Sequence, residues 1–142
     1  MSRSLLLALS LAGAPVMTMA QTYTDAYWQL LAIDGTRTVA RATLRIDKDN
    51  VLAGAAPCNR WSGNNGAVLP ALSLGAIRST RMACDRLAEE QAFFEALSQM
   101  TAVALDGERN LILTGPDGRT MEFVPDGADN AAETCKTCTP AD

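Results

Sequence analysis

Two cysteine-bearing segments, 57–63 and 79–84, carry the residue types best suited to chemistry in this chain. Each places a thiol close to arginine and hydroxyl side chains. Such groups suit a disulfide staple at a fixed polar corner of the fold, which we take as the main interpretation. The alternative is a recognition surface, because arginine and tryptophan are enriched among interface hot spots. The candidate contact residues of that surface are Asn59, Arg60, Trp61, Thr80 and Arg81.

The four cysteines allow three pairings. We favour a disulfide between Cys58 and Cys84, because both flank a loop-rich stretch and an exported protein meets an oxidising compartment. The two positions are 26 residues apart. A bridge that closes such a loop stabilises a domain by about 3 kcal/mol in the chain-entropy description.

The remaining cysteines, Cys135 and Cys138, form a Cys-x-x-Cys motif close to the C-terminus. Redox chemistry at this spacing needs a helix N-terminus and a supporting fold, and neither is indicated here. A zinc site needs further ligands, and the chain has no histidine to supply them. We expect a local tail disulfide, or free thiols without a catalytic role. A pair that tethers another protein or scavenges metal is the alternative.

The chain contains no histidine at all. That absence excludes Ser-His-Asp and Cys-His catalysis, and no carboxylate pair has a spacing typical of acid–base catalysis. We therefore expect a protein that is not an enzyme, without catalytic residues, cofactor or bound metal.

The first 20 residues resemble a secretory signal. Arg3 precedes an apolar stretch at 5–12, and small residues at Thr18 and Ala20 suit a cleavage site before Gln21. This stretch is too short to span a membrane, and no lipidated cysteine follows it. Cleavage would leave 11 basic and 16 acidic residues, a balance that argues against nucleic acid or an anionic membrane as partner. We expect a periplasmic or secreted protein.

Strands are predicted before the first cysteine at 27–33, 42–46 and 51–54, from their β-branched and alternating residues. Asp47–Asn50 is the expected hairpin turn. A calcium loop there is disfavoured, because Val51 and Leu52 occupy positions that would need a ligand and a glycine. Residues 55–73 are expected to be loop-like, and short strands are expected at 67–69 and 72–74. A further strand is expected at 77–81, just before the second cysteine segment.

One helix is predicted, from an N-cap at Asp85 to about residue 100. Its apolar stripe contains Leu87, Phe94, Leu97 and Met100, with the glutamates on the remaining surface. Phe93 and Phe94 are expected to pack in the core.

Three further strands are predicted at 102–105, 110–114 and 120–124, separated by glycine-containing turns. The domain is expected to cover residues 21–125, followed by a flexible acidic tail at 126–142. One helix among many short strands favours a mainly β (α+β) fold. A small curled antiparallel sheet or barrel, with the helix at about 85–100, would bury the apolar residues.

The two cysteine segments, in this order and followed by a helix with Glu90 and Phe94, resemble the META domain of HslJ-like heat-shock proteins. The resemblance covers about 27–124. It implies a small β-rich fold in exported or envelope-associated proteins, with links to stress response and novobiocin tolerance and no established catalytic activity. Relatives are often lipoproteins, whereas this chain lacks the lipidated cysteine. Its Cys-x-x-Cys tail lies outside the family pattern.

The sequence is compatible with three functions. The first is an exported, non-enzymatic stress-response or envelope-maintenance domain, monomeric, which binds an unknown envelope protein or small ligand. The second is a secreted protease inhibitor or small-ligand carrier, with contacts at the barrel mouth or at the loop 64–70. The third, an enzyme, is disfavoured for the reasons above.

Overall fold

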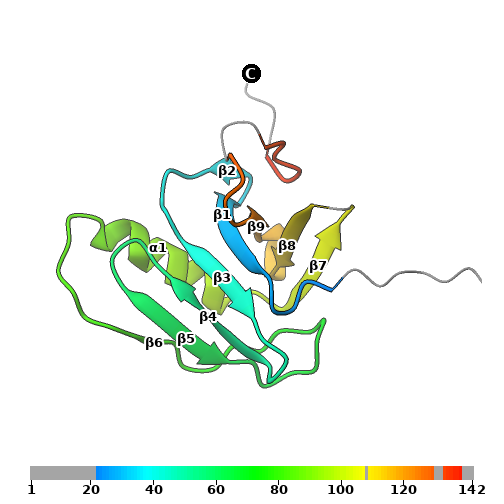
Figure 1. The fold of residues 1–142 in the computed structure, drawn as a ribbon, viewed down its shortest axis with the longest axis horizontal. Coiled ribbons are helices and arrows are strands. Elements are labelled where there is room, and N and C mark those ends of the chain that lie inside the picture. Colours follow the sequence, from blue (N-terminus) through cyan, green and yellow to red (C-terminus); the bar gives the residue numbers. More distant parts are fainter. Residues whose placement is uncertain (1–21, 108, 130–132, 139–142) are drawn as a thin grey trace, which may run out of the picture.

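The computed structural model describes residues 22–107, 109–129 and 133–138; the predicted signal at 1–20 lies outside the described residues. The described chain forms an antiparallel sheet with a single α-helix packed beside it (Figure 1). The elements, in chain order, are β1 (Tyr27–Ile33), β2 (Thr36–Arg37), β3 (Thr43–Ile46), β4 (Val51–Ala55), β5 (Arg60–Asn64), β6 (Arg78–Ser79), α1 (Leu87–Ser98), β7 (Ala102–Asp106), β8 (Asn110–Thr114), a 3-10 turn (Pro116–Gly118) and β9 (Thr120–Pro125).

The sheet has the strand order β6-β5-β4-β3-β1-β9-β8-β7, with β2 paired to the end of β1. It curls without closing into a barrel, because β6 and β7 remain its two edges. The segment between β5 and β6 crosses toward β7, where Ala71 forms an isolated bridge with Ala102. The expected curled antiparallel sheet with one helix is confirmed.

The core lies between the concave face of the sheet and α1. Leu111, Leu113, Met121 and Phe123 are fully buried, as their alternation in β8 and β9 predicts. Trp61 of β5 packs edge-on against Phe93 of the helix, with ring centroids 5.8 Å apart. This packing holds the β5–β6 end of the sheet against the helix.

The helix differs from its prediction at its start and in its buried face. It begins at Leu87, and Arg86 rather than Asp85 occupies the N-cap position, without a side-chain cap. Leu87 is 49 % exposed, whereas Glu90, Phe93, Ala96 and Leu97 are buried. The buried stripe therefore contains a carboxylate. An apolar pattern alone cannot reveal this, because the burial of Glu90 depends on hydrogen-bond donors from Cys58 and Asn59, the two residues just before β5.

The loop expected at 55–73 is wrong in part, because β5 pairs with β4 over five residues, from Arg60 opposite Ala55 to Asn64 opposite Val51. Outward and buried side chains alternate along β5, but glycine and asparagine obscure this period in the sequence. The strands expected at 67–69 and 72–74 are absent from the described structure, and the strand expected at 77–81 shortens to β6.

Candidate functional site

Asn59, immediately before β5, is held in place by the helix. The Asn59 and Cys58 backbone N–H groups donate to Glu90 Oε2 at 2.8 and 2.9 Å, and the Asn59 amide donates to Glu90 Oε1 at 2.7 Å. Asn59 and Glu90 are 5 % and 6 % exposed. These donors compensate the carboxylate for the loss of water, so that the helix can bury a charge on its packed face.

The other end of the Asn59 side chain ties the second cysteine segment to the first. Asn59 Oδ1 accepts hydrogen bonds from Thr80 Oγ1 at 2.8 Å and from the Met82 backbone N–H at 2.7 Å. Thr80 Oγ1 in turn accepts from the Arg60 N–H at 3.1 Å. We name this group of Asn59, Thr80, Met82 and Glu90 the polar corner.

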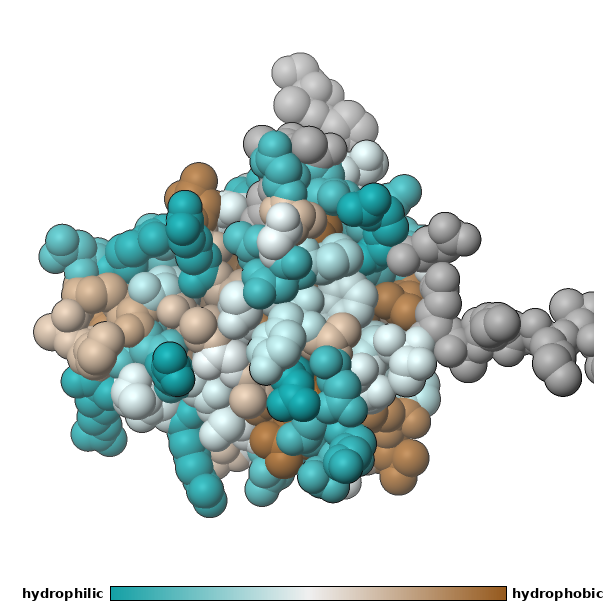
Figure 2. All heavy atoms as spheres, viewed as in Figure 1, coloured by the Kyte–Doolittle hydropathy of each residue, from teal (hydrophilic) through white to brown (hydrophobic). Residues whose placement is uncertain are grey.

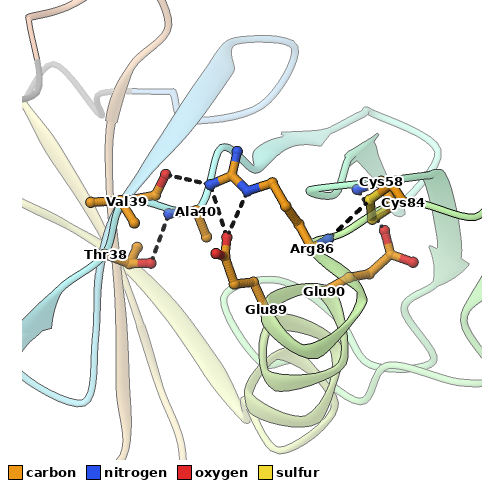
Figure 3. A network of polar contacts seen from close by, with 8 residues as sticks. All are labelled: Thr38, Val39, Ala40, Cys58, Cys84, Arg86, Glu89 and Glu90. Atoms are coloured by element: carbon orange, nitrogen blue, oxygen red, sulfur yellow. Dashed lines mark hydrogen bonds and ion pairs between the residues drawn. A yellow bond between two sulfur atoms is a disulfide. The ribbon is translucent and has the colours of Figure 1, made fainter.

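A disulfide between Cys58 and Cys84 closes the polar corner, which confirms the predicted pairing. Arg86 extends the network toward the opposite side: its guanidinium donates to the Val39 carbonyl at 2.9 Å and pairs with Glu89 at 2.8 Å (Figure 3). The start of the helix is thus joined to the start of β5 by a covalent bond and to the β2–β3 connection by an arginine.

The five candidate contact residues separate into two groups. Asn59 and Trp61 are buried, and Trp61 lies in the aromatic cluster of the core, where its indole N–H has no hydrogen-bond partner among the described residues. Arg60, Thr80 and Arg81 are exposed. A hollow of about 320 Å³ lies beside Arg60 and Thr80, and another of about 350 Å³ lies beside Thr80 and Arg81. The polar corner therefore supports an exposed surface built from the second group.

The Cys-x-x-Cys tail forms a second polar cluster that the sequence pattern does not reveal. Cys135 and Cys138 form a disulfide, and the loop between them lies over Glu122 of β9. Glu122 is fully buried. Its carboxylate accepts from the Lys136 N–H at 2.7 Å, and from the Thr137 N–H and hydroxyl, each at 2.7 Å. The Asn110 amide also donates to it.

Burial acts to raise the pKa of Glu122, but the donors of Lys136, Thr137 and Asn110 outweigh it and hold the pKa below its usual value. The carboxylate is therefore ionised and serves as the anchor of the tail loop. The sequence predicts a mobile tail from residue 126, whereas the structure docks residues 133–138 on β8 and β9. The strand alternation of β9 gives no sign of this contact, because Glu122 lies outside the apolar core cluster and its donors come from Asn110 of β8 and from the tail loop.

A third charged contact, between Arg119 and Asp34, joins the turn after β1 to the start of β9. The two side chains pair at 2.7 Å, and Arg119 also donates to Gln99 at 2.8 Å. The hydrogen bond with Arg119 is the main reason that the pKa of Asp34 lies below its usual value. The contact connects three loops and contributes to the frame of the fold.

Within the part of the chain that the structure describes, no group of three or more carboxylate or cysteine side chains is arranged to hold a metal ion. No described helix is long and apolar enough to cross a membrane. The two disulfides fit an exported protein, because such bonds persist in oxidising compartments.

Comparisons with known proteins agree with this architecture. The family model described as META domain matches residues 21–128. Two solved structures are similar: an NMR structure of a protein from Burkholderia xenovorans, at 24 % identity over 75 % of this chain and 85 % of that one with a TM-score of 0.57, and an NMR structure of a further protein, at 19 % identity over 70 % and 88 % with a TM-score of 0.53. These two show the fold alone. No curated protein matches the chain.

Proposed function

Because the chain belongs to the META domain family, we propose that it is an exported, non-enzymatic domain of stress response or envelope maintenance that acts by binding a protein or a small ligand. The binding surface in this proposal is the exposed part of the two cysteine segments, with Arg60, Thr80 and Arg81 as its contact residues.

One observation carries the proposal. The polar corner uses its amide, carboxylate and threonine groups internally, while Arg60 and Arg81 beside it are exposed and take part in none of the described ion pairs. The network holds the start of β5, the end of β6, the disulfide and the helix in place beside these arginines. Such a surface is preorganised, because its backbone loses little conformational entropy on binding.

The non-enzymatic part of the proposal rests on the chemistry of the side chains. Thr80 is already hydrogen-bonded to Asn59 and to the backbone of Arg60, and the chain has no histidine to act as its base. Nucleophilic catalysis by a hydroxyl needs such a base within hydrogen-bond reach.

The test is a survival assay in cells that lack the native copy, under heat or novobiocin stress. Arg60→Ala and Arg81→Ala are compared with Arg41→Ala, which removes the same charge from an exposed position outside the surface. We expect the first two variants to lose protection while their circular dichroism and melting temperature stay native. Full protection by both folded variants, or loss of folding in both, would overturn the assignment of this surface.

A further inference from the structure

Charge is unevenly distributed along this acidic chain. The formal net charge is −4, yet residues 50–84 contain three arginines, Arg60, Arg78 and Arg81, and no lysine, aspartate or glutamate. All three arginines are exposed, and none takes part in the ion pairs of the described residues. The β4–β6 end of the sheet is therefore a basic island. We propose that its outer face binds an extended acidic polypeptide segment of a partner protein.

The strand register defines the shape of this face. Arg45, Ala53, Ser62 and Arg78 are successive partners across β3, β4, β5 and β6, so their side chains stand in one row on one face. Arg45 and Arg78 flank two small residues. A second row on the same face lies two residues along β5 from the first, and in it Ala55 of β4 is the cross-strand partner of Arg60 of β5. We name this strip of small residues, bordered by Arg45 on the β3 side and by Arg60 and Arg78 on the β5–β6 side, the outer trough.

The surface is hollowed where the trough meets the edge of the sheet. Ser62 and Arg78 line both a hollow of about 170 Å³, next to Gly63 and Gly75, and the hollow of about 320 Å³ next to Arg60. Figure 2 shows the face over β3–β5 as mostly pale, with hydrophilic side chains around it. A strand-like segment can thus approach the backbone of β5 closely, because the outward residues of the strip are small.

The two walls of the trough differ in charge. Arg45 is neutralised by Asp25 at 2.7 Å and lies over the Tyr27 ring at 5.6 Å. Arg60 and Arg78 on the other side have no such partner among the described residues. A ligand that follows the β5–β6 side therefore meets two uncompensated guanidinium groups, and guanidinium groups bind carboxylates in a bidentate geometry.

The spacing of the arginines favours an extended ligand. Arg60 stands two residues along β5 from Ser62, the partner of Arg78. Arg60 and Arg78 are thus separated by about 7 Å along the strands and by one strand spacing of about 4.8 Å across the sheet, close to the distance of about 7 Å between alternate side chains of an extended peptide. A segment with acidic residues at alternate positions can thus place one carboxylate beside each arginine.

This inference rests on the proposed function, since it names the partner class of the same surface, but its test is separate. The full mature chain is titrated with a fluorescein-labelled decapeptide of alternating glutamate and serine (the acidic peptide), and anisotropy gives the dissociation constant. A neutral peptide carries glutamine at every glutamate position. A block peptide has the same composition as the acidic peptide, with all glutamates before all serines, and vesicles of phosphatidylglycerol are the lipid comparison.

The host variants are Arg60→Ala, Arg78→Ala, their double variant and Arg41→Ala. We expect the acidic peptide to bind more tightly than both the neutral and the block peptide. Each single variant at Arg60 or Arg78 should weaken binding about three- to fivefold, the double variant about tenfold or more, and Arg41→Ala less than about twofold. Higher salt should weaken binding, because the arginines are exposed. Amide shifts at Ala53 and Ser62 in NMR spectra should follow the same titration.

Three results would overturn the inference: equal binding of the neutral peptide, equal weakening by Arg41→Ala, or binding to the vesicles without binding to the acidic peptide. Loss of stress protection in Arg60→Ala and Arg81→Ala without any peptide binding would leave the proposed function standing and refute the acidic partner. Binding of the acidic peptide to the unaltered chain, together with full stress protection by Arg60→Ala and Arg81→Ala, would support the acidic partner and refute the proposed function.

Discussion

Glu90 and Asn59 are 31 residues apart in the chain, and a single carboxylate holds both the backbone and the side chain of the asparagine. Oε2 accepts the Asn59 backbone N–H at 2.8 Å, and Oε1 accepts its side-chain amide at 2.7 Å. The contact fixes the start of β5 relative to α1. It explains how an acidic residue can occupy the buried face of the only α-helix in the described chain.

Removal of the Glu90 carboxylate should destabilise the domain strongly. Glu90→Ala leaves three N–H donors without their acceptor, and we expect the free energy of unfolding to fall by about 3 kcal/mol. Glu90→Gln should cost less, because its carbonyl oxygen still accepts. Urea denaturation measures both, with Glu95→Ala on the helix as the control, expected to change stability by about 0.5 kcal/mol or less. Equal stabilities of Glu90→Ala and the control would contradict the role assigned to the polar corner.

Gly54 in β4 should not tolerate a methyl group. A Cβ at this position would lie 2.0 Å from the Thr43 carbonyl oxygen, which belongs to the neighbouring backbone. Gly54→Ala must therefore push β3 and β4 apart, and we expect a loss of about 2 kcal/mol or more. Gly66→Ala is the matched control, because its Cβ would lie 3.5 Å from the Ser73 oxygen at ordinary contact distance. Thermal denaturation compares the two; a Gly54→Ala protein as stable as the control would refute the close strand approach.

Glu122 should make stability depend on pH in the acidic range. Its pKa in the folded state lies below the usual value, so the unfolded state takes up the proton first as pH falls. The stabilisation is complete above the ordinary glutamate pKa of about 4.3 and is lost as pH falls through the lower folded value. Glu122→Gln should therefore be less stable than wild type at pH 7 and show a smaller loss between about pH 5 and pH 3.

Urea midpoints over this pH series measure the effect. Asp34, whose pKa is also lowered, retains its own contribution in the variant and leaves a residual slope. A Glu122→Gln curve parallel to that of wild type would show that the tail loop does not bind the ionised carboxylate.

The two disulfides should differ in their contribution to stability. Cys58–Cys84 spans 26 residues and Cys135–Cys138 spans three. In the chain-entropy description, Cys58→Ala/Cys84→Ala should lose about 3 kcal/mol and Cys135→Ala/Cys138→Ala about 2 kcal/mol. Denaturation of both double variants under the same conditions tests this order, and a larger loss for the tail pair would contradict it.

The tail disulfide should also control local order around Glu122. In Cys135→Ala/Cys138→Ala the loop is free to open, and the Lys136 and Thr137 amides should exchange with solvent faster while core amides such as that of Leu113 remain protected. Hydrogen exchange followed by NMR measures this difference. Unchanged protection at residues 136 and 137 would mean that the loop keeps its place without the covalent bond.

The prediction from sequence was most accurate where a local pattern is strong. Tyr27–Ile33 and Asn110–Thr114 form strands with the expected bounds, because β-branched and large apolar side chains fit a half-buried pleated surface. Asp34 and Gly35 adopt positive φ angles of 47° and 74°, as a tight turn requires. The prediction was least accurate for β5, where small and polar residues form a strand only because β4 and β6 pair with them on either side.

The family, the mainly β architecture with one helix and the Cys58–Cys84 pairing could be predicted from the sequence. Each of these depends on residue types, on short-range periodicity or on motif order. Only the folded chain reveals that Glu90 and Glu122 are buried acceptors, that Trp61 belongs to the core and that Arg60 and Arg78 are exposed on neighbouring strands. The reason is physical: a buried charge is stable only beside its donors, and these donors come from segments that folding, not sequence proximity, brings together.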